Sequence, residues 1–163
     1  MSVTDPAPAP TPRRPRLSGW GRVLVAVYAI LAIAATGRSI SQAADRWAEA
    51  PVTISLSILA GVVYLVAGLA LALAWRRIAW VTIGFEMAGV LIVGTLSVLA
   101  PAWLGIHDPA DIDPFHGRLG TVWSWWGMGY LGIPLVLPVL GLVYLARSRR
   151  AAAAPAPVPE AVA

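Results

Sequence analysis

The chain has 163 residues, of which 58% are apolar and only 12% carry a charge. Soluble domains carry about one quarter charged residues, so this composition excludes an ordinary soluble fold. The absence of cysteine excludes disulfide bonds, thiolate metal sites and a cysteine nucleophile. The net charge of +4 comes from arginines that gather between apolar stretches, and it indicates membrane topology rather than nucleic-acid binding.

Both ends of the chain are rich in proline and alanine. Residues 1–16 and 148–163 contain almost nothing large and apolar, so we predict disordered cytoplasmic tails there and a transmembrane domain over residues 17–147. A basic end before a short apolar stretch is also typical of a signal peptide, with small residues near Ala43 and Ala44 as a cleavage site. An uncleaved first span needs fewer assumptions.

Four apolar stretches predict four transmembrane helices, at about residues 20–42, 52–75, 78–100 and 121–146. The first is short, because Arg22 and Arg38 are separated by roughly 24 Å of helix, whereas a bilayer core is about 30 Å thick. Either both arginines extend toward the membrane surface, or the helix continues past Arg38 with that side chain turned inward. Only Arg76 and Arg77 separate the second and third stretches, which predicts a tight helical hairpin.

The arginines predict the orientation of these spans. Nine of the twelve lie before or early in the first stretch, between the second and third, or after the fourth: Arg13, Arg14, Arg16, Arg22, Arg76, Arg77, Arg147, Arg149 and Arg150. Basic residues gather on the cytoplasmic side of a membrane, and tryptophans gather at both of its surfaces, as they do at the predicted boundaries here. We therefore predict an all-α, antiparallel, transmembrane four-helix bundle in the plasma membrane, with both termini cytoplasmic.

Glu86 is the only acidic side chain within a predicted span. A charge there is costly, so we expect a functional carboxyl that faces protein or water and is protonated unless it has a partner. It lies on a stripe of small residues, and Tyr28, Tyr64 and Tyr130 lie on similar stripes of the other helices. We predict a polar cluster of Glu86 with Tyr28 or Tyr64. An ion pair with Arg38 remains open, as does a carboxyl that only orders helix packing or a subunit contact.

The loop after the third span contains two histidines and three aspartates: His107, Asp108, Asp111, Asp113 and His116. These side chains can ligate a divalent metal, but their spacing matches no established metal motif. Two of the aspartates precede proline, which is typical of turns, so we favour a solvated loop without a metal. No histidine lies within a predicted span, which excludes haem held by two histidines, and we predict no cofactor.

Pro134 and Pro138 interrupt the fourth stretch, close to Gly129 and Gly132. We expect kinks whose free backbone groups are satisfied by neighbouring helices. The alternative is a transport site lined by those free carbonyls.

Three segments carry a family resemblance: TGRSISQ at 36–42, GFEMAGVLIVGTLS at 84–97 and TVWSWWGMGYLGIPLVLPVLGL at 121–142. In these segments the chain resembles a family of small four-span integral membrane proteins of actinobacteria, over about residues 20–146. The resemblance includes Arg38 and Glu86. It implies the four-span topology and leaves the activity open.

The sequence contains no Ser/His/Asp constellation, phosphate-binding loop or dinucleotide fingerprint. We therefore expect a non-enzymatic structural or accessory subunit of a membrane complex, in contact with the bilayer and with a second copy or another subunit. The alternative is a small transporter or channel subunit that uses Glu86. An intramembrane enzyme, or a helper that binds lipid or quinone, ranks third.

Overall fold

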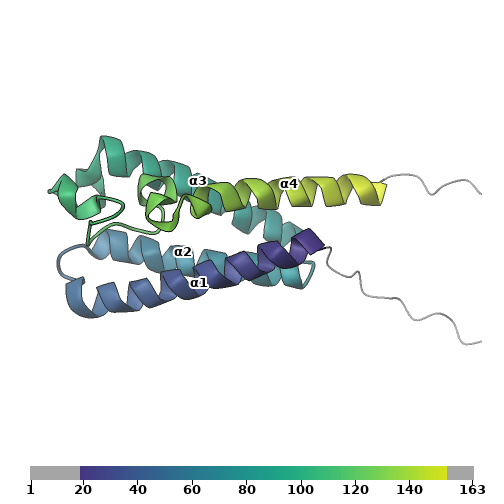
Figure 1. Ribbon diagram of the computed structural model, residues 1–163, viewed down its shortest axis with the longest axis horizontal. Coiled ribbons are helices and arrows are strands. Elements are labelled where there is room, and N and C mark those ends of the chain that lie inside the picture. Colours follow the sequence, from purple (N-terminus) through teal and green to yellow (C-terminus); the bar gives the residue numbers. More distant parts are fainter. Residues whose placement is uncertain (1–18, 154–163) are drawn as a thin grey trace, which may run out of the picture.

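The computed structural model describes residues 19–153, and within that range it is helical with no strand. Figure 1 shows four long helices: α1 (Gly19–Arg46), α2 (Pro51–Ala72), α3 (Arg76–Leu99) and α4 (Ile133–Ala153). Three short 3₁₀ helices, η1 (Pro101–Leu104), η2 (Pro109–Ile112) and η3 (Ser124–Tyr130), lie between α3 and α4. The tail predicted over residues 1–16 lies outside the described residues, as do residues 154–163. Residues 148–153, which we predicted in the C-terminal tail, continue α4.

The first helix is longer than the predicted first span. α1 has 28 residues, which corresponds to about 42 Å at 1.5 Å per residue, and it passes Gly37 and Arg38 without a break. Arg38 is half-buried. Of the two alternatives for the short first stretch, the structure therefore has the helix that continues with Arg38 turned toward protein.

Proline and a left-handed residue set the limits of the next two helices. Pro51 is the first residue of α2, where its fixed φ suits a helix start and its missing N–H costs nothing. After α2 the chain turns at Ala74, whose φ is 57°, and the Trp75 N–H donates to the Ala70 carbonyl at 2.8 Å. α3 then ends just before Pro101, which does not continue the helical hydrogen bonds.

The helices pack side by side, with α1 against α2, α2 against α3, and both η3 and α4 against α3. α1 begins and α4 ends at the same end of the molecule, where the α2–α3 turn also lies (Figure 1). We name this the arginine end, because it carries Arg22, Arg76, Arg77, Arg147, Arg149 and Arg150. The opposite end, formed by residues 47–50 and 100–132, is named the loop end.

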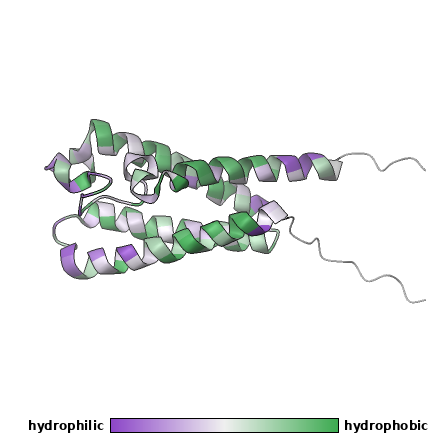
Figure 2. Cartoon of the chain, viewed as in Figure 1, coloured by the Kyte–Doolittle hydropathy of each residue, from purple (hydrophilic) through white to green (hydrophobic). Residues whose placement is uncertain are grey.

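The outward faces of the helices are apolar. Ile33 is 73% exposed, Val81 71% and Ile92 60%, an arrangement that water disfavours and lipid does not. Figure 2 shows the hydrophobic residues along the middle of the helices and the hydrophilic ones mainly toward the ends. Three of the described helices, α1, α2 and α3, are long and apolar enough to cross a membrane, and η3 with α4 adds a fourth crossing when the two are taken as one broken span.

The fourth predicted stretch, residues 121–146, is not one helix. Its first part forms η3, and the chain bends by 99° between η3 and α4. Trp125, Trp126, Gly127 and Leu131 all have positive φ values, between 51° and 81°, so this part of the stretch forms no α-helix, and α4 begins only at Ile133. Pro134 lies in the first turn of α4, where proline is well tolerated, and only Pro138 lies inside the helix. The span is thus broken at residues 125–132, before the prolines, where we expected kinks at Pro134 and Pro138.

Candidate functional site

A buried hydrogen bond joins Glu86 of α3 to Tyr28 of α1. The Tyr28 hydroxyl donates to Glu86 Oε2 at 2.7 Å, and both residues are 0% exposed. Among the described residues, the second carboxyl oxygen, Oε1, has no hydrogen-bond partner. The structure therefore places the predicted acid and one of its predicted tyrosine partners in contact.

The second tyrosine belongs to the same cluster but bonds elsewhere. Tyr64 of α2 is 0% exposed, and its ring centroid lies 6.4 Å from that of Tyr28. Its hydroxyl accepts a hydrogen bond from the indole Nε1 of Trp123 at 2.9 Å. Because Trp123 is 1% exposed and immediately precedes η3, it brings the non-helical segment deep into the space between the long helices.

Glycines make room for these large side chains. A Cβ atom at Gly89 of α3 would lie 2.7 Å from the Trp123 ring, and one at Gly68 of α2 would lie 3.2 Å from Tyr28 Cβ. A Cβ at Gly141 of α4 would lie 3.0 Å from Ile83 and 3.5 Å from the Tyr28 hydroxyl. The small-residue positions of the sequence therefore let the helices pack closely around the tyrosines and Trp123.

Arg38 does not pair with Glu86. Its Nη2 donates to the Gly120 carbonyl at 2.9 Å, and one turn later Gln42 Nε2 donates to the Arg118 carbonyl at the same distance. The arginine ion pairs formed by residues 19–153 are Arg46–Glu49 and Arg118–Asp111, and His116 Nδ1 lies 3.3 Å from Asp113; all three contacts lie at or beside the loop end. The ion pair left open by the sequence is not formed, because the loop returns over α1 and gives Arg38 a carbonyl to bind.

Tyr130, the third predicted tyrosine, is not joined to the cluster by a side-chain hydrogen bond in the described part of the chain. It is half-buried at the end of η3. The prediction assumed one continuous fourth helix whose inner face carried Tyr130. The break between η3 and α4 removes that helical periodicity, so the position of Tyr130 on a stripe no longer places it beside Glu86.

The segment before η3 is fixed by its own side chains. Thr121 Oγ1 accepts hydrogen bonds from the backbone N–H groups of Trp123 and Ser124 at 3.0 and 3.1 Å, and Ser124 Oγ accepts from the Thr121 N–H at 2.9 Å. These reciprocal bonds resemble those of a capping box, but they fix the turn that precedes η3. Further along, Ser97 Oγ of α3 accepts from the Trp125 N–H at 2.8 Å. These bonds hold Trp123 in position between the helices.

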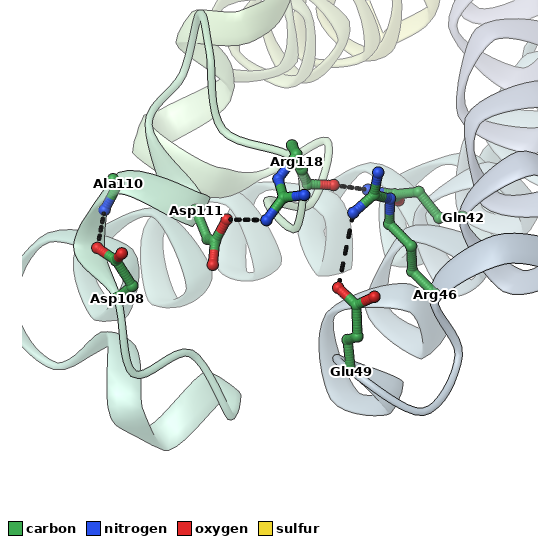
Figure 3. Close-up of polar contacts among 7 residues, drawn as sticks. All are labelled: Gln42, Arg46, Glu49, Asp108, Ala110, Asp111 and Arg118. Carbon is green, nitrogen blue, oxygen red and sulfur yellow. Dashed lines mark hydrogen bonds and ion pairs between the residues drawn. The ribbon is translucent and has the colours of Figure 1, made fainter.

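Four of the five histidines and aspartates of the loop, all but His107, have structural partners. Figure 3 shows Asp108 accepting from the Ala110 N–H at 2.9 Å and Asp111 bonded to Arg118 at 3.2 Å. Asp113 accepts from the N–H groups of His116 and Phe115, and these two bonds lower the pKa of its carboxyl. His107 is exposed. Within residues 19–153, no three His, Cys, Asp or Glu side chains converge as a metal ion requires.

Trp123, Gln42, Ser97 and Thr121 were not predicted as parts of the site. We had assigned Trp123 to the membrane surface, as most tryptophans near a span boundary would be. One sequence feature could have predicted this segment. The Thr-x-x-Ser spacing at 121–124 resembles a helix start, and glycines follow it at 127 and 129.

The resulting site is a closed polar cluster of Glu86, Tyr28, Tyr64 and Trp123 inside an apolar helical body. Two openings on the surface, a groove between α1 and α2 and a cleft between α1 and α4, are lined by none of these four side chains. The four residues of the cluster join α1, α2, α3 and the η3 segment.

Comparisons with protein-family models, with curated proteins and with solved structures found no match to this chain.

Proposed function

We propose that the chain is a multi-pass plasma-membrane protein, an antiparallel bundle of four spans with both termini cytoplasmic. Supporting this topology, the six arginines of the arginine end lie together and the acids other than Glu86 in residues 19–153 lie toward the other end. The exposed faces between the two ends are apolar over a length that suits a bilayer. η3 then dips into the bundle from outside, and α4 completes the fourth span.

Within that membrane, we propose a non-enzymatic accessory role in a larger complex. The observation that carries this proposal is the contrast between inside and outside: the Tyr28–Glu86 and Trp123–Tyr64 hydrogen bonds are closed within the bundle, whereas a groove of about 310 Å³ lies open on the α1–α2 surface. Small and weakly polar residues of α1, Thr36, Ser39 and Ala43, line one wall, and Gly61 of α2 lies in the other. Such surfaces let a helix backbone approach closely in lipid. The occupant we propose is a membrane-spanning helix of a partner subunit.

Filling the groove tests this role. Ala43→Phe should block the partner helix and shift the detergent-solubilised complex from native membranes to the size of the free chain. Ala88→Phe on the exposed face of α3 is the matched control and should leave the complex intact. A wild-type chain that runs as a monomer and forms no cross-links in native membranes would overturn the accessory role. A complex containing only this chain would assign the groove to a second copy.

A second candidate, a small transporter or channel subunit, is favoured by a different observation. Glu86 Oε1 and Ser57 Oγ are buried without a hydrogen-bond partner in the described structure, and buried polar atoms usually have one. In this proposal they bind a proton or a water during transport. The test is proton or ion flux in reconstituted vesicles: Glu86→Gln should abolish a flux that the wild-type chain shows, and an unchanged flux would end this candidate.

A further inference from the structure

A cleft of about 450 Å³ opens at the arginine end, between the start of α1 and the last turns of α4. Trp20 and Leu24 line it from α1. From α4 it is lined by one helical face, formed by Leu140, Val143, Tyr144, Arg147, Ser148 and Ala151. Figure 1 shows both helix ends free of the loops that cover the opposite end of the molecule.

The lining of this cleft changes in character along α4. Leu140 and Val143 are apolar, and Arg147 follows Leu140 by two turns, or roughly 10 Å toward the arginine end. Trp20 and Tyr144 have rings with one apolar and one polar side, as is common where hydrocarbon meets water. A ligand that matches this gradient has an apolar chain at one end and a polar head at the other.

The polar head must be an anion. The arginine end carries six arginines, and within residues 19–153 every acidic side chain other than the buried Glu86 lies at the loop end or in the last turn of α1 beside it. No carboxylate in that range therefore neutralises Arg147. A guanidinium group binds phosphate through two parallel hydrogen bonds, and basic clefts between helices near the cytoplasmic surface suit phospholipid heads.

We propose that this cleft binds one anionic phospholipid, with the phosphate against Arg147 and an acyl chain along Leu24, Leu140 and Val143. The inference rests on the membrane insertion proposed above, because the apolar part of the cleft meets lipid only in a bilayer. The lipid fills the space where α1 and α4 do not meet, and it holds these two helix ends together.

The experiment uses the purified full chain in mild detergent with equal amounts of phosphatidylglycerol and phosphatidylcholine, followed by native mass spectrometry. The wild-type chain should retain one phosphatidylglycerol in preference to phosphatidylcholine. Arg147→Gln should reduce that retention about tenfold, because the charge-assisted hydrogen bonds to the phosphate are lost. Arg149→Gln removes the same charge two residues away, outside the cleft, and should retain the lipid.

Several outcomes would overturn the site. Equal retention of both lipids, or equal losses in Arg147→Gln and Arg149→Gln, would mean a diffuse attraction to charge. Displacement of the lipid by an equal concentration of glycerol phosphate would mean a site for phosphate alone. Lipid that binds only after removal of residues 154–163 would assign the cleft to the chain's own tail.

Val143→Trp tests the position of the acyl chain, because it fills the apolar part of the cleft and keeps Arg147. It should also lower lipid retention, and unchanged retention would contradict the acyl position.

Failure of the membrane proposal gives a different result. A chain that washes off membranes in alkaline carbonate would overturn insertion itself. A chain that stays with the membrane but does not discriminate between the two lipids would overturn only the lipid site.

Discussion

The two ends of the molecule are held together by different forces. At the loop end, hydrogen bonds join segments far apart in the sequence: Arg38 to Gly120, Gln42 to Arg118, Trp123 to Tyr64 and Trp125 to Ser97. Nearer the arginine end, one side-chain hydrogen bond joins two helices, from Tyr28 to Glu86, and those of Thr82 and Ser148 stay within their own helices. Beyond Tyr28 and Glu86, helix contacts depend on apolar packing, and a cleft remains between α1 and α4.

This difference shows what polar groups contribute in an apolar body. Hydrogen bonds between segments require particular partners and so favour one arrangement of the chain, whereas packing of apolar residues tolerates several. A segment as irregular as η3 has backbone groups that must find partners, and Ser97 and Thr121 supply some of them. The regular helices of the arginine end satisfy their own backbone groups and need no such help.

The largest effect is expected where α3 meets Trp123. Gly89→Leu should lower the free energy of unfolding by about 2–3 kcal/mol, because the new side chain overlaps an indole ring that has no room to move. Thermal unfolding in detergent measures the loss. Gly84→Leu on the same helix meets nothing within 4 Å and should change stability by less than about 0.5 kcal/mol. Equal losses would show that Trp123 is not seated on α3.

The next effect concerns the central hydrogen bond. Tyr28→Phe removes the donor to Glu86 and leaves a buried carboxyl oxygen unsatisfied, at a cost of about 1–3 kcal/mol. Glu86→Gln keeps an acceptor for the Tyr28 hydroxyl and should cost less than about 1 kcal/mol. Denaturant unfolding of both single variants and the double variant measures their coupling. Because Glu86→Gln keeps the acceptor, Tyr28→Phe should cost about the same in both backgrounds. A Tyr28→Phe variant as stable as the wild-type chain would contradict the hydrogen bond.

A smaller, local effect is expected for Arg38. Arg38→Ala removes the donor to the Gly120 carbonyl, which should cost about 1 kcal/mol and speed amide hydrogen exchange over residues 119–124. Arg46→Ala breaks only an exposed ion pair with Glu49 and is the control, with an expected cost below about 0.5 kcal/mol. Unchanged exchange in Arg38→Ala would mean that the arginine does not hold the loop.

The smallest effect concerns the turn at Asp113. Hydrogen bonds from the N–H groups of His116 and Phe115 lower the pKa of this carboxyl in the folded chain. The stability that this carboxylate contributes is therefore fully present above the unfolded pKa, which is about 3.9 for aspartate. It is lost as the pH falls through the lower pKa of the folded chain. The protection of these two amides against hydrogen exchange, relative to the intrinsic rate at each pH, should fall over that range. In Asp113→Asn, which accepts without titrating, this fall should vanish, and its persistence would contradict the assignment.

Much of the helical body could be predicted from the sequence, because long apolar stretches bounded by prolines and arginines leave few alternatives. The pairing of Glu86 with a tyrosine followed from the cost of burying an unpaired carboxyl. The path of residues 100–132 could not be predicted. It depends on Arg38 and Gln42 meeting carbonyls some eighty residues away, and on a glycine at position 89 leaving space for an indole. Such contacts between distant segments leave no periodic pattern.

The same limit explains the error in the fourth span. Residues 121–146 are apolar throughout, and apolar composition alone does not distinguish a straight helix from a segment that folds back into protein. The glycines at 127, 129 and 132 were visible signals of a break. Their importance became clear only from the left-handed conformations within η3, at residues 125–127, and directly after it, at residues 131–132.

The most direct test of the account is the accessibility of single cysteines in intact cells, since the chain has none of its own. Ala110, Leu73 and Arg150 are exposed positions at the loop end, in the α2–α3 turn and near the end of α4, and none of them has a positive φ. A membrane-impermeant maleimide should label Ala110→Cys from outside, and should label Leu73→Cys and Arg150→Cys only after the membrane is permeabilised. Labelling of Leu73→Cys or Arg150→Cys in intact cells would contradict the four-span topology with both termini inside.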